Sequence, residues 1–109
     1  MTPEYNYSMS GVLKNAIDWA SRPYGDSAWN GKPVAILSAS PGMAGGLRAQ
    51  YHLRQCFVFL NGLVMNRPEV MIPAAHTKFD ENGRISDQVT LDFIKAHLTA
   101  FKAWVLRMR

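Results

Sequence analysis

Two short apolar runs separated by a long helical pattern constrain most strongly what this 109-residue chain can fold into. The first run, at residues 33–39, reads PVAILSA, and the second, at residues 69–72, reads EVMI. Continuous apolar runs of this length between turn residues are typical of strands buried on both faces of a sheet. Because a helical pattern connects them, the two strands are expected to be parallel, with the helix as the crossover.

Three amphipathic segments predict the helices. The first follows Ser10, a residue type suited to the N-cap, and should end near Arg22 because the next residue is proline. The second is expected at residues 47–64, and the third should run from the N-cap Asp87 to about residue 108. The resulting order helix–strand–helix–strand–helix predicts an α/β fold with a parallel sheet, in one domain.

Composition and charge exclude several classes of protein. Of the residues, 48% are apolar, so a core can form and disorder is not expected. No run approaches the roughly 18–20 apolar residues of a membrane-spanning helix, and the first residues do not read as a signal peptide. The net charge of +4 is modest and forms no dense basic stripe, so neither a nucleic-acid nor a membrane partner is expected. The single Cys56 fits a reducing cytoplasm and a core position.

Two loops are the candidate binding segments. Residues 3–10 combine proline, asparagine and tyrosines, and residues 38–46 are small and glycine-rich; each loop leads directly into a helix. Ligands of open parallel sheets bind beyond the carboxyl ends of the strands, and helix starts offer unpaired N–H groups. Neither loop is a P-loop or a Gly-x-Gly-x-x-Gly motif, and the glycines alone are equally consistent with a simple turn.

No metal or covalent centre is predicted. The three histidines have no ligand spacing with one another or with Cys56, and no Gly-x-Ser-x-Gly motif is present. Asp80 and Glu81 precede Asn-Gly and are interpreted as turn residues, not as an acid/base pair. No catalytic side chain is therefore expected.

The sequence TPEYNYSMSGVLKNAIDW, at residues 2–19, closely resembles the flavin-loop signature of the NAD(P)H-dependent FMN reductase family. This is the flavodoxin-like group that includes chromate and quinone reductases. The resemblance continues through GKPVAILSASPGMAGGLRAQYHLRQ and VMNRPEVMI into the last helix. It implies a flavodoxin-like parallel sheet, FMN as cofactor, NAD(P)H as electron donor, and a quinone, free flavin or similar small molecule as acceptor.

The resemblance also implies roles for individual residues. The first loop would run along the isoalloxazine ring, mostly through backbone N–H groups, with the second loop close to the ring or the nicotinamide. The implied cofactor-binding residues are Pro3, Glu4, Tyr5, Asn6, Tyr7, Ser40 and Gly42. Related enzymes are homodimers or tetramers, and Arg48, Tyr51 and Glu69 match positions of a polar network between subunits. The alternative interpretation of these three residues is a solvated helix and strand edge.

The resemblance covers the C-terminal half of the family's pattern, residues 1–109 forming a partial flavodoxin-like domain. The family's chain begins with a strand and a loop that cradles the FMN phosphate, and Met1 and Thr2 would be the stub of its third strand. Without that cradle FMN should bind weakly, and the strand at 33–39 should expose an apolar edge. Large faces of the first two helices are also expected to stay exposed.

Three explanations remain open for this half-length pattern. The chain is a fragment of a complete reductase, a half-chain stabilised by self-association, or one part of a protein whose first half comes from a separate chain. The alternative to an FMN-dependent oxidoreductase is accordingly an inactive truncated fragment or a non-enzymatic interaction module that uses its exposed sheet edge.

Overall fold

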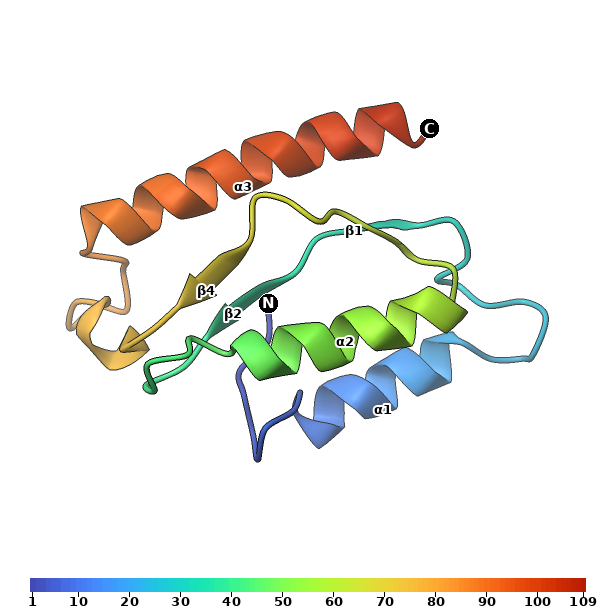
Figure 1. Cartoon of the computed structure of the whole chain (residues 1–109), viewed down its shortest axis with the longest axis horizontal. Coiled ribbons are helices and arrows are strands. Elements are labelled where there is room, and N and C mark those ends of the chain that lie inside the picture. Colours follow the sequence, from blue (N-terminus) through green and yellow to red (C-terminus); the bar gives the residue numbers. More distant parts are fainter.

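The computed structural model describes residues 1–109 and confirms the predicted order of elements, although the strand expected at residues 33–39 is divided into two and a short additional strand precedes the one expected at residues 69–72. Helices α1 (Gly11–Ala20) and α2 (Leu47–Phe59) lie on one side of the strands, and α3 (Gln88–Arg107) lies on the other (Figure 1). A 3-10 turn, η1 (Ala75–Thr77), precedes α3. The chain therefore forms the three-layer α/β arrangement that alternating helices and strands favour.

Four short strands form two parallel pairs. β1 (Pro33–Val34) pairs with β3 (Leu63–Val64), and β2 (Leu37–Ala39) pairs with β4 (Val70–Ile72). The parallel direction agrees with the prediction. The expectation of one continuous strand at residues 33–39, buried on both faces, was wrong: it is split, and most of its residues are only half-buried.

The split has its origin in the partner segment. Val34 pairs with a residue 30 positions further on, whereas Leu37 pairs with one 33 positions further on. The extra residues make the segment 65–69 bulge out of the ladder, and Pro68 has no N–H group with which to pair. Both helix layers hold this bulge. Arg54 of α2 donates to the Met65 carbonyl at 3.2 Å, and His97 Nδ1 of α3 donates to the Pro68 carbonyl at 2.8 Å.

The prediction that the second helix continues to residue 64 was wrong, because α2 ends at Phe59. Asn61 has a left-handed φ of 54°, and a Cβ on Gly62 would lie 2.7 Å from the Phe57 ring. Only glycine fits this close turn. The chain then enters β3, whose apolar Leu63 and Val64 had continued the helical spacing.

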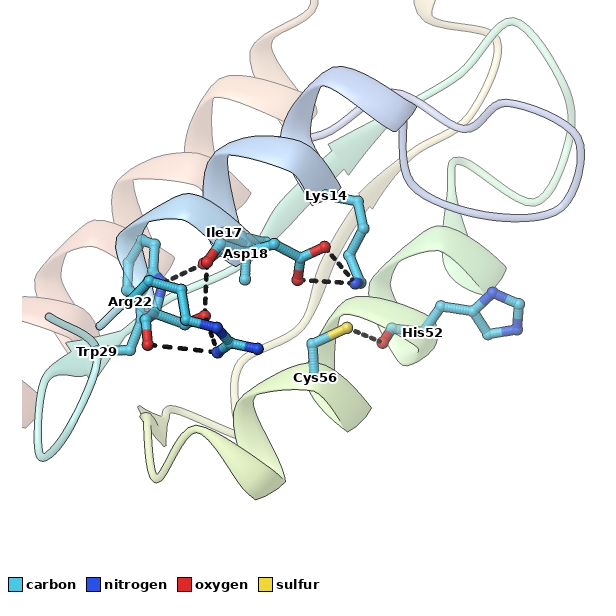
Figure 2. A network of polar contacts seen from close by, with 8 residues as sticks. Lys14, Ile17, Asp18, Arg22, Trp29, His52 and Cys56 are labelled. Atoms are coloured by element: carbon cyan, nitrogen blue, oxygen red, sulfur yellow. Dashed lines mark hydrogen bonds and ion pairs between the residues drawn. The ribbon is translucent and has the colours of Figure 1, made fainter. Parts of the chain in front are cut away.

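Side chains satisfy the backbone at both ends of α1. Ser10 Oγ accepts a hydrogen bond from the Leu13 N–H group at 3.2 Å, which confirms the predicted N-cap. At the other end, Trp29 Nε1 donates to the Ile17 carbonyl at 3.0 Å (Figure 2). Ser21 Oγ donates to the Asp18 carbonyl at 2.6 Å. These bonds use carbonyls that a helix end leaves free, and they attach α1 to the loop that follows it.

The core lies between α1, α2 and the strand layer. Its buried apolar residues are Met9, Ile17, Ile36, Leu53 and Phe57. The rings of Trp29 and Phe57 meet edge to face, with their centroids 5.4 Å apart. Cys56 packs against this cluster, as expected, and its thiol lies 3.5 Å from the His52 carbonyl (Figure 2).

The helices also carry apolar side chains that this chain leaves exposed, as predicted for α1 and α2. These residues are Val12 and Trp19 on α1, Leu47, Tyr51, Val58 and Phe59 on α2, and Val89, Phe93, Leu98 and Leu106 on α3. α3 is nevertheless well attached, because the Trp104 indole donates to the Leu63 carbonyl at 2.7 Å. None of the helices has the length and apolar character that crossing a membrane requires.

Replacing Ser10 with alanine should lower the free energy of unfolding by about 1 kcal/mol, because the Leu13 N–H group loses its acceptor. Chemical denaturation followed by circular dichroism measures this change. Ser10→Asp keeps an acceptor at the same place and should stay close to the wild type. An equal loss in both variants would contradict the capping role.

The cap of α3 should weaken in acid. Asp87, the predicted N-cap, accepts hydrogen bonds from the Thr90 N–H and hydroxyl groups, which lower the pKa of Asp87 below its ordinary value of 3.8; nearby Lys78 adds to this shift. Because the folded-state pKa is the lower one, Asp87 stabilises the fold above pH 3.8 and loses this effect as the pH falls through the folded-state pKa.

The helical signal of the wild type, measured between about pH 5 and pH 2, should therefore show a loss that Asp87→Asn lacks, since asparagine caps a helix without titrating. The same acid profile in both proteins would show that another group causes the loss.

Candidate functional site

The two candidate loops leave neighbouring parallel strands at the same edge. Thr2 pairs with Ser38 in a parallel bridge. Its N–H group donates to the Leu37 carbonyl at 2.9 Å, and its carbonyl accepts from the Ala39 N–H group at 3.3 Å. Thr2 therefore occupies a strand position beside β2, as predicted. Because parallel strands end at the same edge, the residues after Thr2 and those after Ala39 lie together where ligands of such sheets bind.

The first loop is a tight turn that presents its tyrosines to solvent. Tyr5 and Ser8 exchange two backbone hydrogen bonds of 2.9 Å. Asn6 and Tyr7 have φ values of 47° and 74°, the left-handed pair of a type I′ turn. The side chains of Tyr5 and Tyr7 are 61% and 62% exposed. The N–H groups of Asn6 and Tyr7 remain free, whereas that of Tyr5 is used inside the turn and Pro3 has none.

A buried polar network fixes the second loop. Ser38 Oγ donates to the Gly45 carbonyl at 2.6 Å. Gln50 Nε2 in turn donates to Ser38 Oγ at 2.8 Å and to the Val70 carbonyl at 2.7 Å. Ser38 and Gln50 are fully buried, so the network joins the loop to β2, β4 and α2. Gln50 was not among the predicted site residues, because a polar residue within an amphipathic helix gives no sign that it is buried.

Gly45 and Gly46 bring this loop close to the strands. Their φ values are 60° and 85°. A Cβ on Gly46 would lie 2.6 Å from the Ser38 Cβ, and one on Gly45 would lie 2.9 Å from the Ile72 nitrogen. The sequence had left open whether these glycines serve a simple turn or a close approach. They serve a close approach, and the partner is the protein's own backbone and the side chain of Ser38.

Ser40 and Gly42, predicted to lie near a ligand, form a small turn at the start of the second loop. Ser40 Oγ accepts from the Gly42 N–H group at 3.1 Å. The Ser40 carbonyl accepts from Ala75 N–H at 3.0 Å, and the Gly42 carbonyl accepts from Ala74 N–H at 3.3 Å. The loop is thereby held against the segment after β4. The N–H groups of residues 43 and 44 remain free beside the start of α2.

The first loop also contacts α2. Glu4 Oε1 lies 3.1 Å from Arg48 Nε, and the Arg48 guanidinium carbon lies 4.1 Å from the centroid of the Tyr7 ring. The pKa of Arg48 is raised, first by its contact with the Tyr7 side chain and also by the charge of Glu4. The carboxylate of Glu4 is therefore engaged with α2, so only the backbone of this residue is available to a ligand.

The residues expected in a network between subunits fall in two places. The Tyr51 hydroxyl donates to Glu69 Oε1 at 2.8 Å, and this hydrogen bond raises the pKa of Tyr51. Arg48 is engaged elsewhere, with Glu4 and Tyr7. A single chain thus joins two of the three. Tyr51 and Glu69 line a hollow of about 750 Å³ together with Arg54, Asn66, Arg67 and Pro68.

The candidate site is an open surface and not an enclosed pocket. The 750 Å³ hollow contains no residue of either loop, and a second hollow of about 560 Å³ lies between β4 and the start of α3. What the loops offer is exposed aromatic rings and free N–H groups at the edge of the sheet. These features fit a flat ring with nitrogen and oxygen acceptors. No group of three or more His, Cys, Asp or Glu side chains could hold a metal ion.

Comparison with known proteins decides the family. Residues 1–77 match the sequence model of the NADPH-dependent FMN reductases. The chain belongs to this family. It is 56% identical over 108 residues to an NAD(P)H-dependent FMN reductase of Pseudomonas aeruginosa, a match that covers 99% of this chain and 58% of that protein. It is 51% identical over 110 residues to a quinone reductase of Escherichia coli, covering 100% of this chain and 58% of that protein.

A solved structure agrees with this assignment. The chain superimposes on FerB, a flavoenzyme NAD(P)H:(acceptor) oxidoreductase from Paracoccus denitrificans, with a TM-score of 0.88 and 38% sequence identity. The match covers 98% of this chain and 59% of FerB. It confirms the predicted flavodoxin-like fold class. The chain spans somewhat more than half the length of the reductases it matches.

Replacing Gly46 with alanine should destabilise the chain more than the same change at Gly83. Both glycines have positive φ, but only at Gly46 would the new Cβ collide with Ser38. Gly83→Ala should cost about 1 kcal/mol of backbone strain, and Gly46→Ala should cost about 1–3 kcal/mol more through overpacking. Thermal unfolding of both variants measures the difference. Equal losses would show that the close approach to Ser38 does not matter.

Proposed function

We propose that this chain carries the ring-side half of an FMN site in an NAD(P)H-dependent reductase that passes electrons to a quinone or a similar small acceptor. Family membership and the activities named for its relatives support this proposal. The observation that carries it is the pairing of Thr2 with Ser38, because this pairing brings the two loops to one edge of the sheet.

The chain's part is to bind and orient the ring. The free N–H groups of Asn6 and Tyr7 would face the nitrogen and oxygen atoms of the isoalloxazine, with Pro3, Glu4 and Tyr5 shaping the turn that presents them. Ser40 and Gly42 would border the ring from the second loop. When bound, FMN supplies the redox chemistry, taking up hydride from NAD(P)H and giving electrons to the acceptor. No side-chain base of this chain is needed for that chemistry.

The same proposal includes a homo-oligomer, dimer or tetramer, in the cytoplasm. The hollow beside Tyr51 and Glu69 is the candidate surface for a second copy. Arg54, which lines this hollow, keeps two donor nitrogens, Nε and Nη2, without any partner inside the chain. Buried donors are normally paired, so a neighbouring chain that supplies an acceptor here would complete the site. Arg48 contributes less directly, because its guanidinium is already paired with Glu4.

Titration of the chain with lumiflavin and with FMN tests the proposal. Lumiflavin carries the isoalloxazine ring without the ribityl phosphate. Both loops would contact the ring and not the phosphate. The two flavins should therefore quench the tryptophan fluorescence of the chain to the same extent and bind with Kd values within about threefold of each other. A sub-micromolar Kd for FMN without comparable binding of lumiflavin would contradict a site that holds only the ring.

A pair of variants at Asn6 serves as the control. Asn6→Gly keeps the N–H group and takes up φ 47° without strain, so flavin binding should be retained. Asn6→Pro loses the N–H group and cannot adopt this φ, so Kd should rise about tenfold. A wild-type chain that binds neither flavin, oxidises no NAD(P)H and self-associates would instead favour the interaction module.

A further inference from the structure

The first loop, at residues 3–10, is attached to α2 at three points. Besides the Glu4–Arg48 ion pair and the Arg48–Tyr7 stacking, Ser8 Oγ lies 3.0 Å from His52 Nδ1. The three residues of the loop lie within five positions of each other, and their partners occupy the first two turns of α2. Contacts this concentrated hold a loop more firmly than its own two backbone hydrogen bonds would.

Glu4 has a second contact that reaches the backbone of the helix. Its Oε2 accepts a hydrogen bond of 3.4 Å from the Ala49 N–H group. The N-cap of α2 is Gly46, which has no side chain to satisfy the first N–H groups of the helix. Glu4 therefore supplies, from 45 residues upstream, the acceptor that the helix lacks locally. A carboxylate at this end also interacts favourably with the helix dipole.

The pairing of Glu4 with Arg48 is shielded from water on the side of Glu4 only. The Glu4 side chain is 11% exposed, whereas the Arg48 side chain is 41% exposed. The Arg48 Nε–H group is buried and is not aligned for a hydrogen bond, so its contact with Glu4 is an ion pair. The other face of the guanidinium covers the ring of Tyr7. One arginine thus connects the start of the loop to its tip.

The tip of the loop needs this support. Asn6 and Tyr7 both have left-handed φ values, which are costly for residues with a side chain and are uncommon for a tyrosine. Strained conformations persist only where the surroundings fix them. Arg48 contacts Tyr7 itself, and His52 contacts Ser8, the residue that follows.

We propose that Glu4 and Arg48 are positioning residues, which clamp residues 3–8 of the first loop onto the start of α2. The clamp would fix the position of the free N–H groups of Asn6 and Tyr7 toward a bound flavin. The inference rests on the proposed function, although the clamp itself does not depend on a ligand. Because α2 begins directly after the second loop, the clamp also fixes the distance between the two loops.

Hydrogen–deuterium exchange tests the clamp without any ligand. Glu4→Gln removes the charge that pairs with Arg48, and it should raise the exchange rate of the hydrogen-bonded amides of Tyr5 and Ser8 about 3- to 10-fold. Glu81→Gln makes the same chemical change at an exposed turn residue and should leave these amides at the wild-type rate. Wild-type exchange at the amides of Tyr5 and Ser8 in Glu4→Gln overturns the proposal.

A double-mutant cycle separates the clamp from a general loss of stability. Arg48→Met removes the guanidinium and keeps an unbranched apolar stem. If Glu4 and Arg48 act as one unit, the double variant should lose no more protection at residues 4–8 than the more damaging single variant. Losses that add in the double variant would show two independent contacts and overturn the clamp.

Flavin binding then tests the positioning role. With lumiflavin as the probe, Glu4→Gln should raise Kd about 3- to 10-fold over the wild type and over Glu81→Gln. Equal Kd values in all three proteins overturn the positioning role. A wild-type chain that binds no lumiflavin overturns the proposed function, and the exchange experiment still decides whether the clamp exists.

Discussion

The candidate site depends on one buried residue, Ser38. Its backbone lies between Thr2 and Met71 in the parallel pairing, and its hydroxyl donates to the Gly45 carbonyl while accepting from Gln50. Since the residue is fully buried, each of these polar groups must find its partner inside the protein. This network fixes the second loop relative to the strands, and the pairing with Thr2 sets where the first loop begins.

The two loops are held by different physical means. The second loop is fixed to the strand layer, by buried hydrogen bonds and by glycines that allow the backbone to come close to Ser38. The first loop is exposed and strained, and it is held from the side by charged and aromatic contacts with α2. Burial makes the first kind of support insensitive to salt, whereas exposed charges are screened. The position of the tyrosine turn is therefore the more adjustable part of the site.

Local signals in the sequence predicted much of the fold. Ser10 and Asp87 were identified as N-caps because a cap depends on a few adjacent residues. The parallel direction followed from the helical connection, and the strand position of Thr2 followed from the family resemblance. The end of α2 was missed because Leu63 and Val64 are apolar in a spacing that suits either a helix or a strand.

The remaining features depend on residues far apart in the chain. The split between the strands arises from a difference in register that neither segment shows by itself. The partner of Arg48 is Glu4, which a helix and two strands separate from it in the sequence. Local sequence therefore gave no sign of this internal ion pair, and the family resemblance suggested a contact between subunits for Arg48. The burial of Gln50 likewise follows from tertiary packing and not from its place in the helix.

The two edges of the β2–β4 pair are built differently, and this difference bears on both functional interpretations. The outer edge of β4 is flanked by Pro68 and Pro73, which cannot donate to another strand and so discourage pairing. The opposite edge, that of β2, has only Thr2 beside it and no proline within the strand. An edge without proline is open to pairing with a further strand. Both functional interpretations use such pairing, and they differ in what the added strand would bring to the loops that follow Thr2 and Ala39.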